Sequence, residues 1–171
     1  TILSTPVAIL PTLTLIFQNE ALITKAATGA IDFASFGLSF PESQTPIFDN
    51  FDPGDITWSG SNYPAVLSVN LWNDAGLSER ITNATNAMIG NQVTLKAFPD
   101  DFTAQVTLKE GHSLYLTRGT YNDSFVAQDN ARFFLESNTC VYGDGIGQTI
   151  IEESTVTRNA RIFTASGLTA P

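Results

Sequence analysis

Apolar and polar residues alternate in short runs along much of this chain, a pattern typical of β-strands that bury one face. The segments 92–98, 104–109 and 113–117 follow one another in this way, separated by Pro-Asp-Asp and Glu-Gly-His turns. In the first half, segment 65–72 has the same pattern and is expected to turn Leu67, Val69 and Leu71 inward. Strands are also expected over segments 12–17 and 154–157. These runs predict a strand-rich chain.

One segment has a helical pattern instead. Residues 77–89 carry apolar side chains at helical spacing, and Gly90-Asn91 would end the helix. We therefore predict an all-β fold class, mainly β with one short helix. The segment 41–64, rich in proline and glycine, is expected to be a loop.

That loop contains three closely spaced carboxylates. Asp49, Asp52 and Asp55 lie beside Asn50 and Gly54. Because Ca²⁺ prefers carboxylate and carbonyl oxygens, this group is a candidate calcium site, although it lacks the EF-hand frame and its terminal glutamate. No other cofactor is predicted.

Residues 113–121 and 132–151 resemble the opening coils of the pectin-lyase-like right-handed parallel β-helix family. A strand ending in Gly119-Thr120-Tyr121 is followed by a further strand, the turn Gly143-Asp144-Gly145 and a strand ending in Thr149-Ile150-Ile151. The resemblance implies an N-terminal anchoring or assembly β domain over residues 1–91 and the start of a β-helix over residues 92–171. An antiparallel β-sandwich or jelly roll remains the alternative.

The resemblance also implies a partner. Stacked coils bury their core against the next coil, so a short stack would need a neighbouring subunit or a continuation of the chain to cover its apolar end. Because β-helical spikes of this family are usually trimers, we expect a homo-oligomer, most simply a homotrimer, or a complex with other structural proteins.

The charge balance narrows the choice of partners. The chain has 8 Lys and Arg against 17 Asp and Glu, a formal net charge of −9. Such a surface repels nucleic-acid phosphates and anionic lipids, so we expect neither as a partner. The sequence contains no run of eighteen apolar residues, so no membrane span is predicted. Charged residues make up only 15% of the chain, and the many Thr, Ser and Asn residues favour an extracellular or virion protein.

Three aromatic residues are candidates for stacking on sugar rings: Trp58, Tyr63 and Tyr121. The only cysteine, Cys140, lies in an apolar run and is predicted to be a buried, unreactive thiol. The only histidine, His112, follows Glu110-Gly111 and is predicted to be a solvated turn residue. A lone histidine also leaves no multi-histidine zinc site.

These observations favour a non-enzymatic structural or attachment segment of an extracellular or virion β-helical protein, such as a phage tailspike, a tail fibre or an adhesin. It would mediate assembly and attachment to a glycan receptor. One alternative is the N-terminal part of a polysaccharide lyase or glycoside hydrolase; in the resembled family the catalytic residues lie on later coils, so none is assigned here. Another is a self-assembling capsid, filament or pilus subunit.

Overall fold

The computed structural model describes residues 2–9, 15–16, 21–33, 38–39, 46–60, 63–74, 76–124, 131–153 and 161–165. Within them lie eighteen short strands, a 3₁₀ turn and one α-helix. The elements before the helix are β1 (Ile2–Leu3), β2 (Val7–Ile9), β3 (Leu15–Ile16), β4 (Ile23–Lys25), β5 (Ile31–Phe33), β6 (Leu38–Ser39), β7 (Phe48–Asp49), β8 (Ile56–Thr57), β9 (Val66–Ser68) and η1 (Val69–Leu71). Then come α1 (Leu77–Ala87), β10 (Val93–Ala97), β11 (Asp101–Phe102), β12 (Val106–Leu108), β13 (His112–Leu116), β14 (Gly119–Asp123), β15 (Ala131–Leu135), β16 (Cys140–Gly143), β17 (Thr149–Glu153) and β18 (Arg161–Ala165).

Strands in this fold pair with strands from the next circuit of the chain. The sheets have the orders β1-β4-β7, β2-β5-β8, β3-β6, β11-β14-β17, β12-β15-β18 and β9-β10-β13-β16. Every pairing among the described strands is parallel. The predicted all-β class with one helix is confirmed, and the antiparallel sandwich is not what these residues form.

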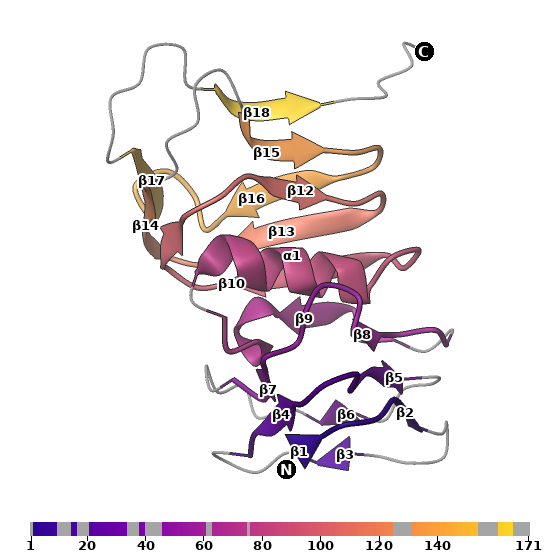
Figure 1. Cartoon of the computed structure of the whole chain (residues 1–171). Helices are drawn as coiled ribbons and strands as arrows, with labels where there is room; N and C mark the ends of the chain where they lie inside the picture. Colours follow the sequence, from indigo (N-terminus) through magenta and orange to yellow (C-terminus); the bar gives the residue numbers. More distant parts are fainter. Residues whose placement is uncertain are drawn as a thin grey trace.

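In many of these pairings, an apolar residue of one strand lies beside an apolar residue of the next. Val7 pairs with Ile31, and Ile31 pairs with Ile56, so one circuit takes about 20 to 30 residues. Burial alternates along β10 and β13: the first, third and fifth residues of each strand are buried, and Leu95 pairs with Leu114. The core is therefore a set of apolar ladders that run from circuit to circuit; Figure 1 shows how the circuits of the backbone stack.

Helix α1 takes the place of a strand between β8 and β12 (Figure 1). The backbone N–H of Trp58, just after β8, donates to the carbonyl of Ala87 at 3.0 Å. On the other side, the Ser78 hydroxyl donates to the Ala104 carbonyl and accepts from its N–H, at 3.0 and 3.2 Å. The Ser78 side chain thus gives the Ala104 backbone the two hydrogen bonds that the backbone of a neighbouring strand would otherwise provide.

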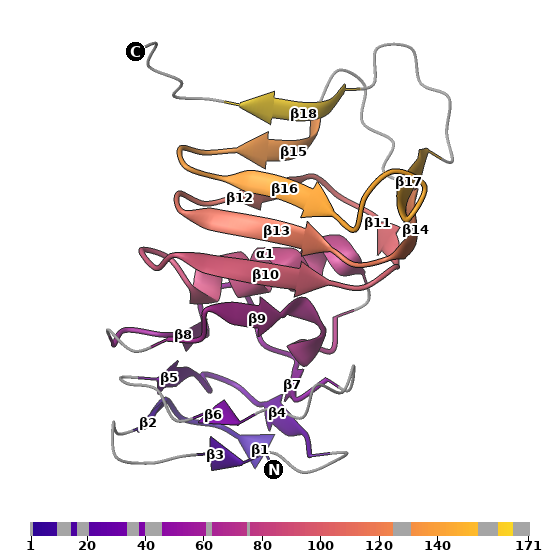
Figure 2. The same cartoon turned by 180° about the vertical axis from the view of Figure 1, so that it is seen from behind.

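An apolar stripe along the helix packs against the core. Leu77, Ile81, Ala84 and Met88 have 0% exposure and recur at three- and four-residue spacing. Because α1 interrupts the stack, the sheets on either side of it are separate, whereas β9-β10-β13-β16 continues past it without a break (Figure 2). We call this four-stranded sheet the long sheet. Strand β9 belongs to the first predicted domain and β10 to the second, so the boundary predicted at residue 91 does not interrupt the long sheet.

The segment 41–64 was predicted to be a loop, but it also contains strands. Its described part contains β7 and β8, and its aromatic side chains belong to the core. Phe33 stacks on Trp58 with 4.7 Å between ring centroids, and Phe48 lies 5.5 Å from Trp72. Two-residue strands are too short to produce an alternating pattern, which is why they were missed.

Two predicted strands have different bounds. The predicted strand 65–72 is interrupted: Val66–Ser68 forms β9, and the chain then forms η1, capped by the Ser68 hydroxyl, which accepts from the Asn70 N–H. The backbone is extended again at Trp72. The Gly119-Thr120-Tyr121 segment, expected to end a strand, begins β14 instead. Gly119 has φ +137° and a Cβ placed there would lie 2.3 Å from Pro99 Cγ, so both the backbone and its neighbour require glycine.

Candidate functional site

A concave surface lies at the start of α1, where the chain between β7 and β8 approaches the helix. It has a volume of about 350 Å³. Its polar lining comprises Asp52, Asp74, Ser78, Glu79, Thr82 and Asn83. We call this surface the acidic cleft, since three of these six side chains are carboxylates.

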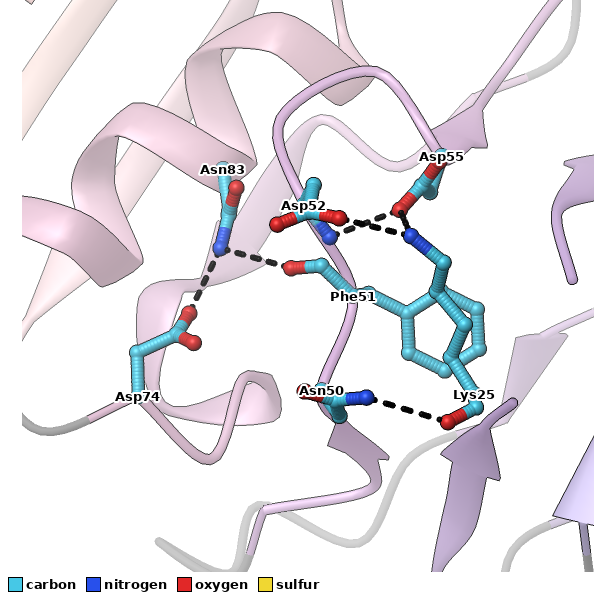
Figure 3. A network of polar contacts seen from close by, with 7 residues as sticks. All are labelled: Lys25, Asn50, Phe51, Asp52, Asp55, Asp74 and Asn83. Atoms are coloured by element: carbon cyan, nitrogen blue, oxygen red, sulfur yellow. Dashed lines mark hydrogen bonds and ion pairs between the residues drawn. The ribbon is translucent and has the colours of Figure 1, made fainter. Parts of the chain in front are cut away.

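Asn83 and Asp74 form the inner wall of the acidic cleft (Figure 3). The Asn83 amide Nδ2 donates to the Asp74 carboxylate at 2.6 Å and to the Phe51 carbonyl at 3.2 Å. Burial raises the pKa of Asp74; the nearby Glu79 carboxylate also raises it, while the hydrogen bond from Asn83 opposes the shift. Asp74 is thus a partly desolvated carboxyl group in a concave site, which is a common property of functional acids.

A lysine forms ion pairs with two carboxylates at the outer side of the acidic cleft. Lys25, at the end of β4, places its Nζ 2.7 Å from Asp52 and 2.5 Å from Asp55 (Figure 3). The hydrogen bond to Asp52, followed by that to Asp55, raises the pKa of the Lys25 ammonium. The Asp52 N–H also donates to the Asp55 carboxylate at 2.7 Å. This loop is therefore ordered by one ammonium group shared between two carboxylates.

The three carboxylates of the predicted calcium site do not converge on one point. Asp52 and Asp55 meet at Lys25, whereas Asp49 accepts from the Asn73 amide at 2.8 Å. Among the residues that the structure describes, no group of three or more His, Cys, Asp or Glu side chains could hold a metal ion. The calcium site stays a prediction without a ligand cluster to support it.

Two of the three predicted sugar-stacking rings belong to the core. Trp58 is 3% exposed, and Tyr121 is fully buried with its hydroxyl donating to the Ala97 carbonyl at 2.8 Å. Neither ring can be reached by a ligand on the surface. Tyr63 is half-buried, and its hydroxyl accepts from the Gln92 N–H at 3.2 Å. The structure does not bring the three together.

The only cysteine and the only histidine each have the opposite solvent exposure from the one predicted. Cys140 is exposed, because it lies on the outer face of β16. His112 is fully buried at the start of β13, with its Nε2 3.0 Å from the Met88 carbonyl. Burial lowers the pKa of His112, so the ring is neutral at neutral pH. Predictions of a buried thiol and a solvated imidazole were both wrong.

Of the polar residues that line the acidic cleft, only Asp52 was identified from the sequence as part of a candidate site, the predicted calcium site. Asp74 was taken as part of a turn, and Glu79 and Asn83 as positions on a helix. Their signal is weak, since it consists only of a carboxylate just before a helix and a polar position one turn further on. The tertiary structure supplies the rest by placing the β7–β8 segment against that helix end.

Comparisons with known proteins gave no match: no family model, no curated protein and no solved structure resembles the chain significantly. Within the described residues, no helix is long and apolar enough to span a bilayer.

Proposed function

We propose that this chain is a structural and attachment segment of an extracellular or virion protein of the β-helical kind, and that its acidic cleft holds a neutral or amino sugar of a glycan. The observation that carries the proposal is the cleft itself. Its volume of about 350 Å³ falls within the usual range of small-ligand sites, about 300–1,000 Å³. The parallel stacking of strands supports the β-helical part of the proposal.

The polar groups of the acidic cleft favour a ligand that donates hydrogen bonds. Asp52, Asp74 and Glu79 offer carboxylate oxygens, which only accept when ionised. The donors present are already used: the Thr82 hydroxyl donates to the Ser78 carbonyl at 2.8 Å, and the Asn83 amide donates to Asp74 and Phe51. Sugar hydroxyls or an ammonium group would satisfy these oxygens, whereas an acidic sugar would be repelled.

We expect neutral or amino oligosaccharides to shift the NMR amide signals of Asp74, Glu79 and Asn83 in a titration of the whole chain. Glu79→Gln and Asp74→Asn should each weaken binding by about 10-fold or more, since a hydrogen bond to a charged group is worth about 1.5–3 kcal/mol. Glu110→Gln, an exposed carboxylate outside the cleft, is the matched control and should bind like the wild type. Absence of binding across a broad panel of such sugars, or equal binding by wild type and Glu79→Gln, would refute the cleft as the glycan site.

Assembly is the second part of the proposed function. Exposed apolar side chains occur in terminal strands of the described sheets, including Ile2 (75%) in β1 and Ile150 (40%) in β17, which is consistent with burial against other copies. We expect light scattering coupled to size exclusion to give about three times the monomer mass of 18.4 kDa. A monomer that persists at micromolar concentration would argue against the homotrimer and leave the glycan site unaffected.

One observation favours an enzyme as a second candidate. Asp74 has a raised pKa and is coupled to a second carboxylate, Glu79, in the same cleft, which is the environment of a general acid in glycoside hydrolysis. The titration separates the two functions, because an oligosaccharide that is cleaved during it, and is not cleaved by Asp74→Asn, would make the chain a hydrolase.

A further inference from the structure

Two tyrosines are stacked on the outer face of the long sheet, away from the acidic cleft. Tyr115 in β13 and Tyr142 in β16 are register partners on neighbouring parallel strands, and these strands lie side by side in Figure 2. Their ring centroids are 5.2 Å apart and the ring planes differ by 17°. The register holds the two rings face to face, in different circuits of the chain.

A carboxylate accepts a hydrogen bond from the phenol hydroxyl of one of these rings. The Tyr115 hydroxyl donates to Asp144 Oδ1 at 2.5 Å, and this hydrogen bond is the main cause of the raised pKa of Tyr115. The Tyr115 phenol is therefore protonated at neutral pH but has a base in place to receive the proton. Loss of an electron from the ring can then be accompanied by transfer of its proton to Asp144.

The pair is also accessible from solvent. Tyr142 is 44% exposed and Tyr115 is partly exposed, whereas Tyr121 is fully buried. Tyr63, the remaining tyrosine of the four in the chain, has no aromatic partner among the described residues. A one-electron oxidant in solution can thus reach one pre-stacked tyrosine pair in the described structure.

We propose that Tyr115 and Tyr142 form an oxidative crosslinking site, at which hydrogen peroxide and a peroxidase join the two rings as dityrosine. Each phenol loses one electron and one proton, and the two phenoxyl radicals combine through ring carbons ortho to the hydroxyl groups. The two ring protons then return to the oxygens, so that both hydroxyls are restored. Hydrogen peroxide accepts the two electrons and two protons and leaves as two molecules of water.

Such a bond would connect β13 to β16 and so fasten one circuit of the stack to the next. It requires no occupant in the acidic cleft, so it is independent of the proposed glycan binding. In a structural protein outside the cell, where oxidants are present and the chain has no second cysteine for an internal disulfide, it would serve as a covalent staple. The crosslinked chain should therefore unfold at a higher temperature than the untreated chain.

The test uses the whole chain carrying Cys140→Ser, because the exposed thiol lies two residues from Tyr142 and would reduce phenoxyl radicals. The treated protein is separated on a denaturing gel, where chains without an intermolecular crosslink form the monomer fraction. After treatment with peroxidase and hydrogen peroxide, the chains of this fraction should lose the mass of two hydrogen atoms and gain dityrosine fluorescence. Trypsin should then release residues 110–118 joined to residues 133–158, since cleavage follows Lys109, Arg118, Arg132 and Arg158.

The controls use the other tyrosines and the proton acceptor. Tyr142→Phe should abolish the intramolecular crosslink and Tyr63→Phe should leave it unchanged, while Asp144→Asn should slow its formation several-fold. Dityrosine found only between molecules, a joined peptide that contains residue 63 or 121, or no product in the monomer fraction would overturn the proposal. Circular dichroism of Tyr142→Phe, expected to match the wild type because the ring is exposed, separates loss of the site from loss of the fold.

Discussion

Replacing Trp72 with alanine is expected to lower the free energy of unfolding by about 3–5 kcal/mol, the usual cost of removing a large buried aromatic side chain. Trp72 is 2% exposed and contacts Phe48, to which it also pairs through a parallel β-bridge. The neighbouring backbone bonds, from Asn73 N–H to the Phe48 carbonyl and from Ile47 N–H to the Leu71 carbonyl, depend on the same packing. The measurement is urea unfolding followed by far-UV circular dichroism.

Two variants calibrate this result. Trp72→Phe keeps an aromatic ring against Phe48 and should lose less stability than Trp72→Ala. Ile146→Ala removes a fully exposed side chain and should change stability by no more than about 0.5 kcal/mol. If Trp72→Ala unfolds at the same urea concentration as Ile146→Ala, Trp72 does not join the first circuits to the rest of the core.

Acidification is the second large effect, and it depends on His112. Its Nε2 lies 3.0 Å from the Met88 carbonyl; because a carbonyl only accepts, Nε2 carries the proton. The other ring nitrogen, Nδ1, is buried and has no hydrogen-bond partner among the described residues. Protonation would place a charged N–H there without an acceptor, which is costly in the core.

The sign of the pH dependence follows from the lowered pKa of His112. Below the ordinary histidine pKa of about 6.5, the unfolded chain binds a proton that the folded chain does not. Stability is therefore fully present above that pH and decreases as the pH falls toward the folded-state pKa. One proton gives a slope of at most about 1.4 kcal/mol per pH unit, which urea unfolding between about pH 7 and 5 would measure.

His112→Gln is the matched control, because a glutamine amide can donate to the Met88 carbonyl and does not titrate. It should remove the slope between about pH 6.5 and 5. His112 is the only histidine in the chain. The shifted carboxyl groups Asp74 and Glu136 start from lower ordinary values, and their pKa values move in opposite directions. An unchanged slope in His112→Gln would assign the acid sensitivity to other groups.

Local patterns predicted the elements that are long enough to show a period. The helix expected over 77–89 is α1, and the alternating segments around residues 95, 107 and 115 are β10, β12 and β13. The two-residue strands β7 and β8 were missed, because neither spans one period of alternation. The strands expected over 12–17 and 154–157 lie mostly outside the described residues.

The candidate site was much less predictable. The acidic cleft depends on contacts such as Asn83 to Phe51 and Lys25 to Asp55, which join residues about 30 positions apart. The burial of His112 and the exposure of Cys140 depend on which face each strand turns toward the stack. A window of a few residues contains neither kind of information.

The amino-acid sequence alone therefore determined the types of the longer elements, the all-β class, the low content of charged residues and the net negative charge, because propensity, periodicity and composition are local properties. Only the tertiary structure decided that the strands pair in parallel one circuit apart, that α1 replaces a strand, and that Asp74 and Asn83 line one cleft while Tyr115 and Tyr142 stack on another face. The physical reason is that parallel pairing brings together residues a whole circuit apart, and the hydrogen bonds of that pairing are made by backbone groups that every non-proline residue carries.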